Sequence, residues 1–237
     1  MDYQKYTIEG TWPCQYAVWL WSRNAGKTFD GAIYLMARAL LFPKMKICIL
    51  SISAKQANET FKKLEDIAKR NISSIVGSTE VFANELIRSN ANSDGFTHGQ
   101  KGHECQLFNG SVIKTIVGTE KTVLGERSNL NFYDEAGNIG PEFFTRTEPF
   151  ATQSKDFKTG SGLNAEILPK DIPNQLIYSS SAEDVNTVLY QRYKECAIKM
   201  MQGIPGYFCV DINCEIPLHP TLNGQKYPPL LTQDKID

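Results

Sequence analysis

An apolar segment that leads into Gly-Lys-Thr has the residue types of a phosphate-binding loop. Tyr16–Trp21 suit a buried strand, and Gly26, Lys27 and Thr28 follow a short turn. A chain that passes from a strand through such a turn into a helix directs several backbone N–H groups, and the positive end of the helix dipole, toward one anion. We expect Lys27 to contact the outer phosphates of a nucleotide and the Thr28 hydroxyl to contact its magnesium ion. The alternative is an ordinary strand-to-helix turn with a surface lysine.

Two adjacent carboxylates follow a second apolar segment further along the chain. Asp134 and Glu135 stand at the end of the strand predicted from Leu130. A carboxylate at this position can hold hydrated magnesium opposite Thr28, and the next one can polarise the water that attacks a terminal phosphate. An Asp-Glu pair alone also fits a solvated turn after a strand. Together with Gly-Lys-Thr, the pair predicts a magnesium-dependent nucleotide hydrolase.

Strand and helix patterns alternate around these two segments. Apolar residues recur at helical spacing over 28–41, a continuous apolar strand follows at Lys46–Ser51, and a second amphipathic helix is predicted over 54–70. This alternation predicts an α/β domain with a mainly parallel central sheet flanked by helices. Asn109-Gly110 separates two further strand patterns, at 104–108 and 111–117, and predicts a β-hairpin added to that sheet.

The two ends of the chain carry weaker patterns. Residues 1–13 are expected to form an irregular lead-in, and the last core elements are predicted to be a helix over 187–201 and a strand at Tyr207–Ile212. The tail from Pro217 is polar and rich in proline. We therefore predict an ATPase domain over 1–212 and a lid or linker segment over 213–237.

Composition limits the remaining possibilities. The 237 residues carry a net charge of −1, so any contact with DNA has to come from a local patch. No apolar run is long enough to span a bilayer, and the N-terminus lacks a signal-peptide pattern, so a cytosolic location is the default. The six cysteines are scattered and are expected to be reduced core thiols. His98, His103 and Cys105 offer a zinc alternative, although their spacing fits no common zinc site.

Four short segments, in the correct order over 16–181, resemble the large subunit of the terminase of tailed bacteriophages, the motor that packs DNA into a procapsid. Residues 22–28 match the family's loop, Ser/Pro-Arg-x-x-Gly-Lys-Ser/Thr, in which the first glycine of the usual pattern is absent and Trp21 stands here instead. Asp134-Glu135-Ala136 is similar to its Walker B ending. Gly125-Glu126-Arg127 is similar to its Gly-x-Arg segment, and 176–181 resemble its coupling motif.

The resemblance implies a P-loop NTPase of the additional-strand, catalytic-glutamate class that binds ATP and Mg²⁺. A strand between the two motifs and the glutamate directly after the aspartate also indicate that class. The implied nucleotide-binding residues are Ser22, Arg23, Asn24, Ala25, Gly26, Lys27 and Thr28, and the implied metal ligands are Thr28 and Asp134. The implied catalytic residues are Glu135, which activates water, and Arg23 and Arg127, either of which neutralises charge on the transferred phosphate. Ser179, Ser180 and Ser181 are implied to couple phosphate loss to movement. Gln15 is available as an adenine contact upstream of the loop.

The resemblance also implies partners and a location. These are double-stranded DNA, a homo-oligomeric ring on a portal protein, the terminase small subunit and a nuclease domain of the full-length chain, in the host cell cytoplasm and without a membrane. The sequence leaves no room for that nuclease domain before Asp237, so we expect no DNA cleavage. Two alternatives remain: a fragment of a superfamily 2 helicase-like ATPase, and a nucleotide-binding assembly switch with little turnover.

Overall fold

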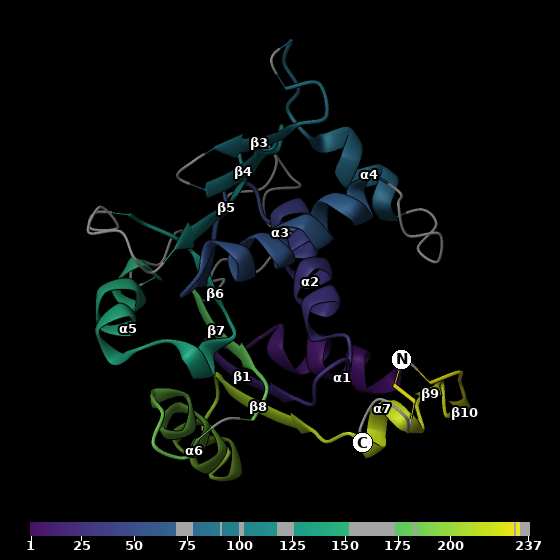
Figure 1. Ribbon diagram of the computed structural model, residues 1–237, viewed down its shortest axis with the longest axis vertical. Helices are drawn as coiled ribbons and strands as arrows, with labels where there is room; N and C mark the ends of the chain where they lie inside the picture. The colour runs from purple at the N-terminus through teal and green to yellow at the C-terminus, as the bar shows by residue number, and fades with distance from the viewer. Residues whose placement is uncertain are drawn as a thin grey trace, which may run out of the picture.

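One eight-stranded sheet organises the chain in the computed structural model, which describes residues 1–69, 78–90, 92–99, 102–117, 126–151, 174–182, 184–229 and 231–232 (Figure 1). The strand order is β3-β4-β5-β2-β6-β7-β1-β8. The six strands β5, β2, β6, β7, β1 and β8 run parallel to one another. At the β5 edge, β4 pairs antiparallel with β5, and β3 pairs antiparallel with β4. The strands are β1 (Tyr16–Trp21), β2 (Lys46–Ser51), β3 (Phe96–Gly99), β4 (Gly102–Gln106), β5 (Val112–Val117), β6 (Leu130–Asp134), β7 (Gln175–Ser180) and β8 (Tyr207–Ile212).

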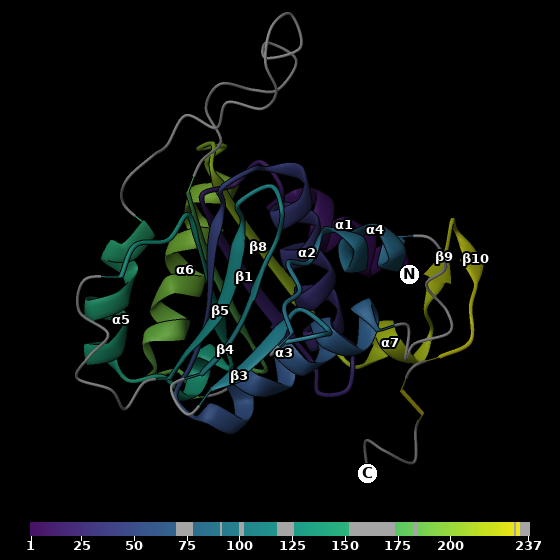
Figure 2. The same ribbon diagram turned by 90° about the horizontal axis from the view of Figure 1, so that it is seen from above.

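Helices cover both faces of this sheet. Figure 2 shows α1, α2 and α3 on one face and α5 and α6 on the other. The expectation of an α/β fold with a mainly parallel sheet is therefore confirmed. The helices are α1 (Asp2–Thr11), α2 (Lys27–Leu41), α3 (Ala54–Ala68), α4 (Ser78–Glu85), α5 (Pro141–Thr147), α6 (Val188–Met201) and α7 (Glu215–Leu218), with 3-10 turns η2 (Ala136–Asn138) and η3 (Glu148–Ala151). No helix among the described residues is long and apolar enough to cross a bilayer.

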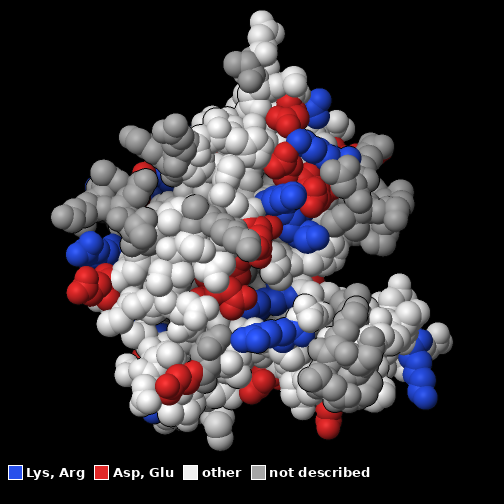
Figure 3. All heavy atoms as spheres, in the orientation of Figure 1, with Lys and Arg blue, Asp and Glu red and all other residues white. Residues whose placement is uncertain are grey.

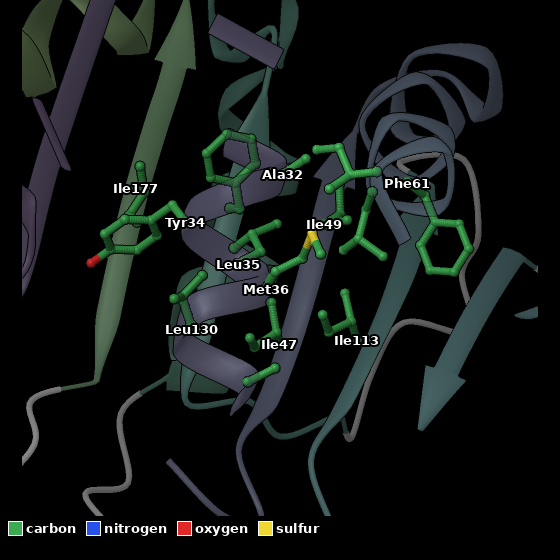
Figure 4. Packing of buried hydrophobic residues seen from close by; sticks show 14 of the residues in the cluster. Ala32, Tyr34, Leu35, Met36, Ile47, Ile49, Phe61, Ile113, Leu130 and Ile177 are labelled. Carbon is green, nitrogen blue, oxygen red and sulfur yellow. The ribbon is translucent and has the colours of Figure 1, made fainter. Parts of the chain in front are cut away.

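The helix after the Gly-Lys-Thr segment packs closely on the middle of the sheet. Leu35 and Met36 of α2 lie against Ile47 and Ile49 of β2 in the buried core (Figure 4). Gly31 permits a still closer approach to β6, because a Cβ atom at this position would lie 2.7 Å from the Phe132 ring. The start of α2 is thereby fixed at the edge of the sheet where the parallel strands end.

The expected irregular lead-in over 1–13 is wrong, because residues 2–11 form helix α1. Its buried face consists of Tyr3, Thr7 and Thr11, which are spaced four residues apart. The threonine hydroxyls are satisfied within the helix, since Thr7 donates to the Tyr3 carbonyl and Thr11 donates to the Thr7 carbonyl. A buried stripe of threonines carries little hydrophobic signal, so the helix is hidden in the sequence pattern.

The C-terminal part of the described chain returns to this same helix. The short strands β9 (Thr221–Leu222) and β10 (Gln225–Lys226) form a hairpin. The Asp2 carboxylate accepts hydrogen bonds from the Thr221 hydroxyl and from the backbone N–H groups of Asn223 and Gly224. The hairpin is thus held against the first turn of α1 and not against the sheet.

Candidate functional site

Three of the parallel strands, β1, β6 and β7, bring predicted site residues to one edge of the sheet. β7 lies between β1 and β6, and Ser179 of β7 pairs with Trp19 of β1 on one side and with Asp134 of β6 on the other. Parallel strands end at the same edge, so Ser22, which follows β1, and Glu135, which follows β6, both stand there. The register therefore places the two sequence motifs on opposite sides of one intervening strand.

The Gly-Lys-Thr loop turns through two left-handed backbone positions. Asn24 has φ 64° and Gly26 has φ 93°, and Gly26 is followed directly by the first residue of α2. Backbone in this conformation turns successive N–H groups toward one side, which favours an anion there. Ala25 between them is fully buried, and its carbonyl accepts a 2.7 Å hydrogen bond from the Tyr3 hydroxyl. Helix α1 therefore supports the loop from behind.

A cavity of about 780 Å³ lies in front of this loop. It is lined by every predicted loop residue except the buried Ala25, and by Glu135 and Ser181 from the ends of β6 and β7. The other wall comes from Ser53, which caps the N-terminus of α3, and from Gln56, Glu59 and Lys63 of that helix. A polar hollow at the end of parallel strands, beside a helix N-terminus, has the location and lining of a phosphate-ligand site.

Lys27 and Glu135 form an ion pair across this cavity. The Lys27 Nζ atom lies 2.8 Å from Glu135 Oε1, and the Lys27 side chain is only 8% exposed. Glu135 has left-handed backbone with φ 51°, and its Oε2 atom accepts a 3.4 Å hydrogen bond from Ser180, whose hydroxyl accepts one from the Gly137 N–H. The glutamate side chain is thus held between the loop lysine and the end of β7.

Asp134 lies deeper, beneath Glu135. Burial raises its pKa to about 6, and hydrogen bonding to Thr60 and the positive charge of Lys27 oppose that rise. Its Oδ2 atom accepts a 2.5 Å hydrogen bond from the Thr60 hydroxyl of α3, and its Oδ1 atom accepts one from the Glu135 N–H. Mg²⁺ prefers oxygen ligands and commonly takes one or two carboxylates together with substrate phosphates. Asp134 at the end of β6 and Thr28 in the first turn of α2 offer oxygen atoms of this kind.

The remaining predicted residues are placed less uniformly. Arg23 is exposed on the loop and borders the cavity. Arg127 lies before Leu130, at the opposite end of β6 from Asp134, and does not border the cavity; Gly125 of the same segment lies outside the described residues. The Ser179 hydroxyl is buried without a hydrogen-bond partner among the described residues.

Two minor expectations do not hold. Gln15 precedes β1 and stands at the end of that strand away from the loop, so its assignment as an adenine contact is wrong. His98 and His103 do face each other across β3 and β4, with their Nδ1 atoms 2.7 Å apart. Cys105, however, is buried, and its pKa is raised by that burial. The described residues contain no group of three metal-ligating side chains, so the zinc alternative has no support.

Sequence reasoning missed the contribution of α3. The sequence predicts only an amphipathic helix here, whereas in the structure Gln56 and Lys63 border the cavity and Thr60 reaches Asp134. These three residues are spaced by four and three positions, which puts them on one face of a helix. The polar stripe was present in the sequence, but nothing in the pattern showed that it faces the end of β6.

No protein-family model matches the sequence, and no curated protein matches it. Similarity appears in the comparison with solved structures. The HK97 bacteriophage large terminase is 16% identical, with a TM-score of 0.66 over 100% of this chain and 45% of that one. The large terminase of a thermophilic bacteriophage, in complex with ADP, is 10% identical, with a TM-score of 0.57 over 94% of this chain and 51% of that one. The chain therefore has the fold of bacteriophage large terminases, and it spans about half of their length.

Proposed function

We propose that the chain is the ATPase domain of a viral DNA-packaging terminase large subunit, which hydrolyses ATP with magnesium to drive double-stranded DNA into a procapsid. One observation carries the proposal: Lys27 and Glu135 come from two separate motifs and pair at a cavity in front of a left-handed loop, and the buried Asp134 beside Glu135 interacts with the charge of Lys27. The position of β7 between β1 and β6 supports a P-loop NTPase of the additional-strand, catalytic-glutamate class.

Each residue then has a distinct role. The loop N–H groups of 22–28 and the Lys27 ammonium bind the phosphates, and Thr28 and Asp134 hold magnesium, which would neutralise phosphate charge when bound. Glu135 orients the attacking water and accepts its proton. Arg23 neutralises charge on the transferred phosphate from within the loop.

Incoming phosphate competes with Glu135 for Lys27. The 2.8 Å ion pair occupies the lysine that binds phosphate and the carboxylate that activates water. Phosphate binding to Lys27 releases Glu135 toward the water, so the hydrolytic arrangement forms only when nucleotide is present. Ser180, which contacts Glu135, and its neighbours Ser179 and Ser181 link the phosphate end of the cavity to β7.

The wider assembly belongs to the same proposal. Arg127, which is remote from the cavity of its own chain, acts on a neighbour's site in a homo-oligomeric ring. The ring sits on a portal protein with the small subunit and a nuclease domain, in the host cell cytoplasm, and 213–237 lead from the ATPase domain over 1–212 toward that nuclease domain. Basic and acidic side chains are interspersed on the face shown in Figure 3, so that face does not carry a broad basic patch for DNA.

The test is magnesium-dependent ATP hydrolysis by the purified chain over a range of protein concentrations. We expect turnover that rises faster than linearly with concentration and is lost in both Lys27→Ala and Glu135→Ala. Glu142→Ala is the matched control, because its carboxylate is 88% exposed on α5. Nucleotide binding that Lys27→Ala leaves unchanged would contradict the site.

The Lys27–Glu135 ion pair also favours a second candidate, a nucleotide-binding assembly switch with little turnover. In the ion pair, the carboxylate that would activate water is bound to the lysine. Nucleotide that drives oligomer formation, with no hydrolysis even when DNA is present, would support the switch. Hydrolysis stimulated by DNA would support the motor.

A further inference from the structure

Helix α3 carries a polar face toward the phosphate cavity. Gln56 and Lys63 border the cavity, and Thr60 lies on the same helix face between them. Because the Thr60 hydroxyl donates a 2.5 Å hydrogen bond to the buried Asp134, this face is tied to the end of β6. The position of the Lys63 stem relative to the predicted metal ligand is therefore set by the fold and not by a surface loop.

Lys63 differs in its surroundings from Lys62 of the same helix and from Lys69 directly after it. Lys69 is paired with Glu65 and Asp94, and Lys62 borders a separate hollow beside Glu65. Within the described residues, no carboxylate forms an ion pair with Lys63. Lys63 therefore brings to the cavity wall a positive charge that no carboxylate of the described residues pairs with, although Glu59 and Glu135 line the same cavity.

The charges around the cavity indicate that a further cation is needed to bind a triphosphate. Lys27 is shared with Glu135, and the carboxylates of Glu59 and Glu135 border the same space. A triphosphate adds a further phosphoryl charge to this environment relative to a diphosphate, and ammonium groups bind phosphate oxygens through short, charge-assisted hydrogen bonds. Arg23 approaches from the loop side, whereas Lys63 approaches from the facing helix.

We propose that Lys63 binds the terminal phosphate of the nucleotide, as a second cation opposite Arg23, and that it distinguishes triphosphate from diphosphate. This inference rests on the proposed function, because it concerns the same cavity. Lys63 is then a catalytic residue that contacts the transferred group, and Thr60 is a positioning residue that acts through Asp134. Loss of the terminal phosphate removes the ligand that α3 shares with the loop.

The experiment measures the dissociation constants of Mg-ADP and of a magnesium-bound non-hydrolysable ATP analogue by calorimetry. We expect Lys63→Met to weaken the triphosphate analogue about tenfold or more, which is the usual size of one charge-assisted phosphate contact, and to weaken ADP less than about twofold. Lys63→Arg should restore most of the affinity for the triphosphate analogue. Lys62→Met, the adjacent lysine beside the other hollow, is the matched control and should change neither constant.

The outcomes separate this inference from the proposed function. If the parent chain binds both nucleotides and Lys63→Met keeps the parent's preference, the role of Lys63 is wrong and the nucleotide site stands. Equal weakening of ADP and the triphosphate analogue in Lys63→Met would also overturn it, since a merely structural effect gives that result. If the parent binds neither nucleotide, both proposals fail.

Discussion

Replacing Glu135 by glutamine should make the chain bind ATP more tightly while abolishing its turnover. Glutamine keeps the shape of the side chain but removes the negative charge that now pairs with Lys27 at 2.8 Å. In the competition proposed above, phosphate has to displace that carboxylate before the lysine is available. In Glu135→Gln the ammonium is available at once, although the residue proposed to activate water is lost.

The size of the effect follows from the surroundings of the pair. A hydrogen bond to a charged group contributes about 1.5–3 kcal/mol net. The Lys27 side chain is 8% exposed but that of Glu135 is 28% exposed, so solvent screens part of the interaction. We therefore expect a gain of about 1–2 kcal/mol, which corresponds to a dissociation constant for Mg-ATP lowered about 5- to 30-fold.

The assay is equilibrium binding of a fluorescent ATP analogue, with hydrolysis measured in parallel. Glu135→Asp keeps the negative charge but withdraws the carboxylate from Lys27. It therefore distinguishes loss of the ion pair from loss of the repulsion between the carboxylate and phosphate. This variant should show part of the gain in ATP affinity. Glu142→Gln removes a charge from the exposed surface of α5 and should gain none. An unchanged or weaker affinity in Glu135→Gln would refute the competition between glutamate and phosphate.

Three further predictions concern the groups around this site and its supporting core. Thr60→Val should raise the magnesium concentration needed for half-maximal hydrolysis, because the buried Asp134 loses its hydroxyl donor and its pKa rises further above about 6; Thr60→Ser should restore the parent value. Arg38→Met should lower the free energy of unfolding in urea by about 2–4 kcal/mol, since the guanidinium is 1% exposed, stacks 4.2 Å from the Trp12 ring centroid and donates to the Trp12 carbonyl. Burial raises the pKa of Asp30 from 3.8 to about 8, so its contribution to stability is full below pH about 4 and is lost as the pH rises through 8. Asp30→Asn should therefore raise the melting temperature relative to the parent at pH 8.5 and not at pH 4, and an equal shift at both would contradict the buried acid.

The central strands were predictable because their patterns are strong. Three apolar runs form strands with the predicted bounds, namely β1 (Tyr16–Trp21), β2 (Lys46–Ser51) and β8 (Tyr207–Ile212). Helix α1 was missed because threonines form most of its buried face. β3 was missed because three of its four residues are exposed at the edge of the sheet. Its sequence therefore lacks the alternation of apolar and polar residues that marks a half-buried strand.

The candidate site was predictable only where it is local in sequence. The loop and the acidic pair are short segments whose residue order implies their chemistry. Thr60 and Lys63 depend on how α3 packs across the ends of the strands, and a helix pattern does not encode that placement. The remoteness of Arg127 from the cavity follows from the direction of β6, which is fixed by parallel pairing with β2 and β7.

The strand that carries the loop takes both of its neighbours from the far end of the chain. Tyr16 of β1 pairs with Leu176 on one side and with Tyr207 on the other. Contacts so distant in sequence slow folding, because a long loop must close before they form. During synthesis, β1 with its Trp19 and Trp21 therefore has no strand to pair with until β7 and β8 have left the ribosome. A chain interrupted before β8 leaves one side of this apolar strand open to pairing with other molecules.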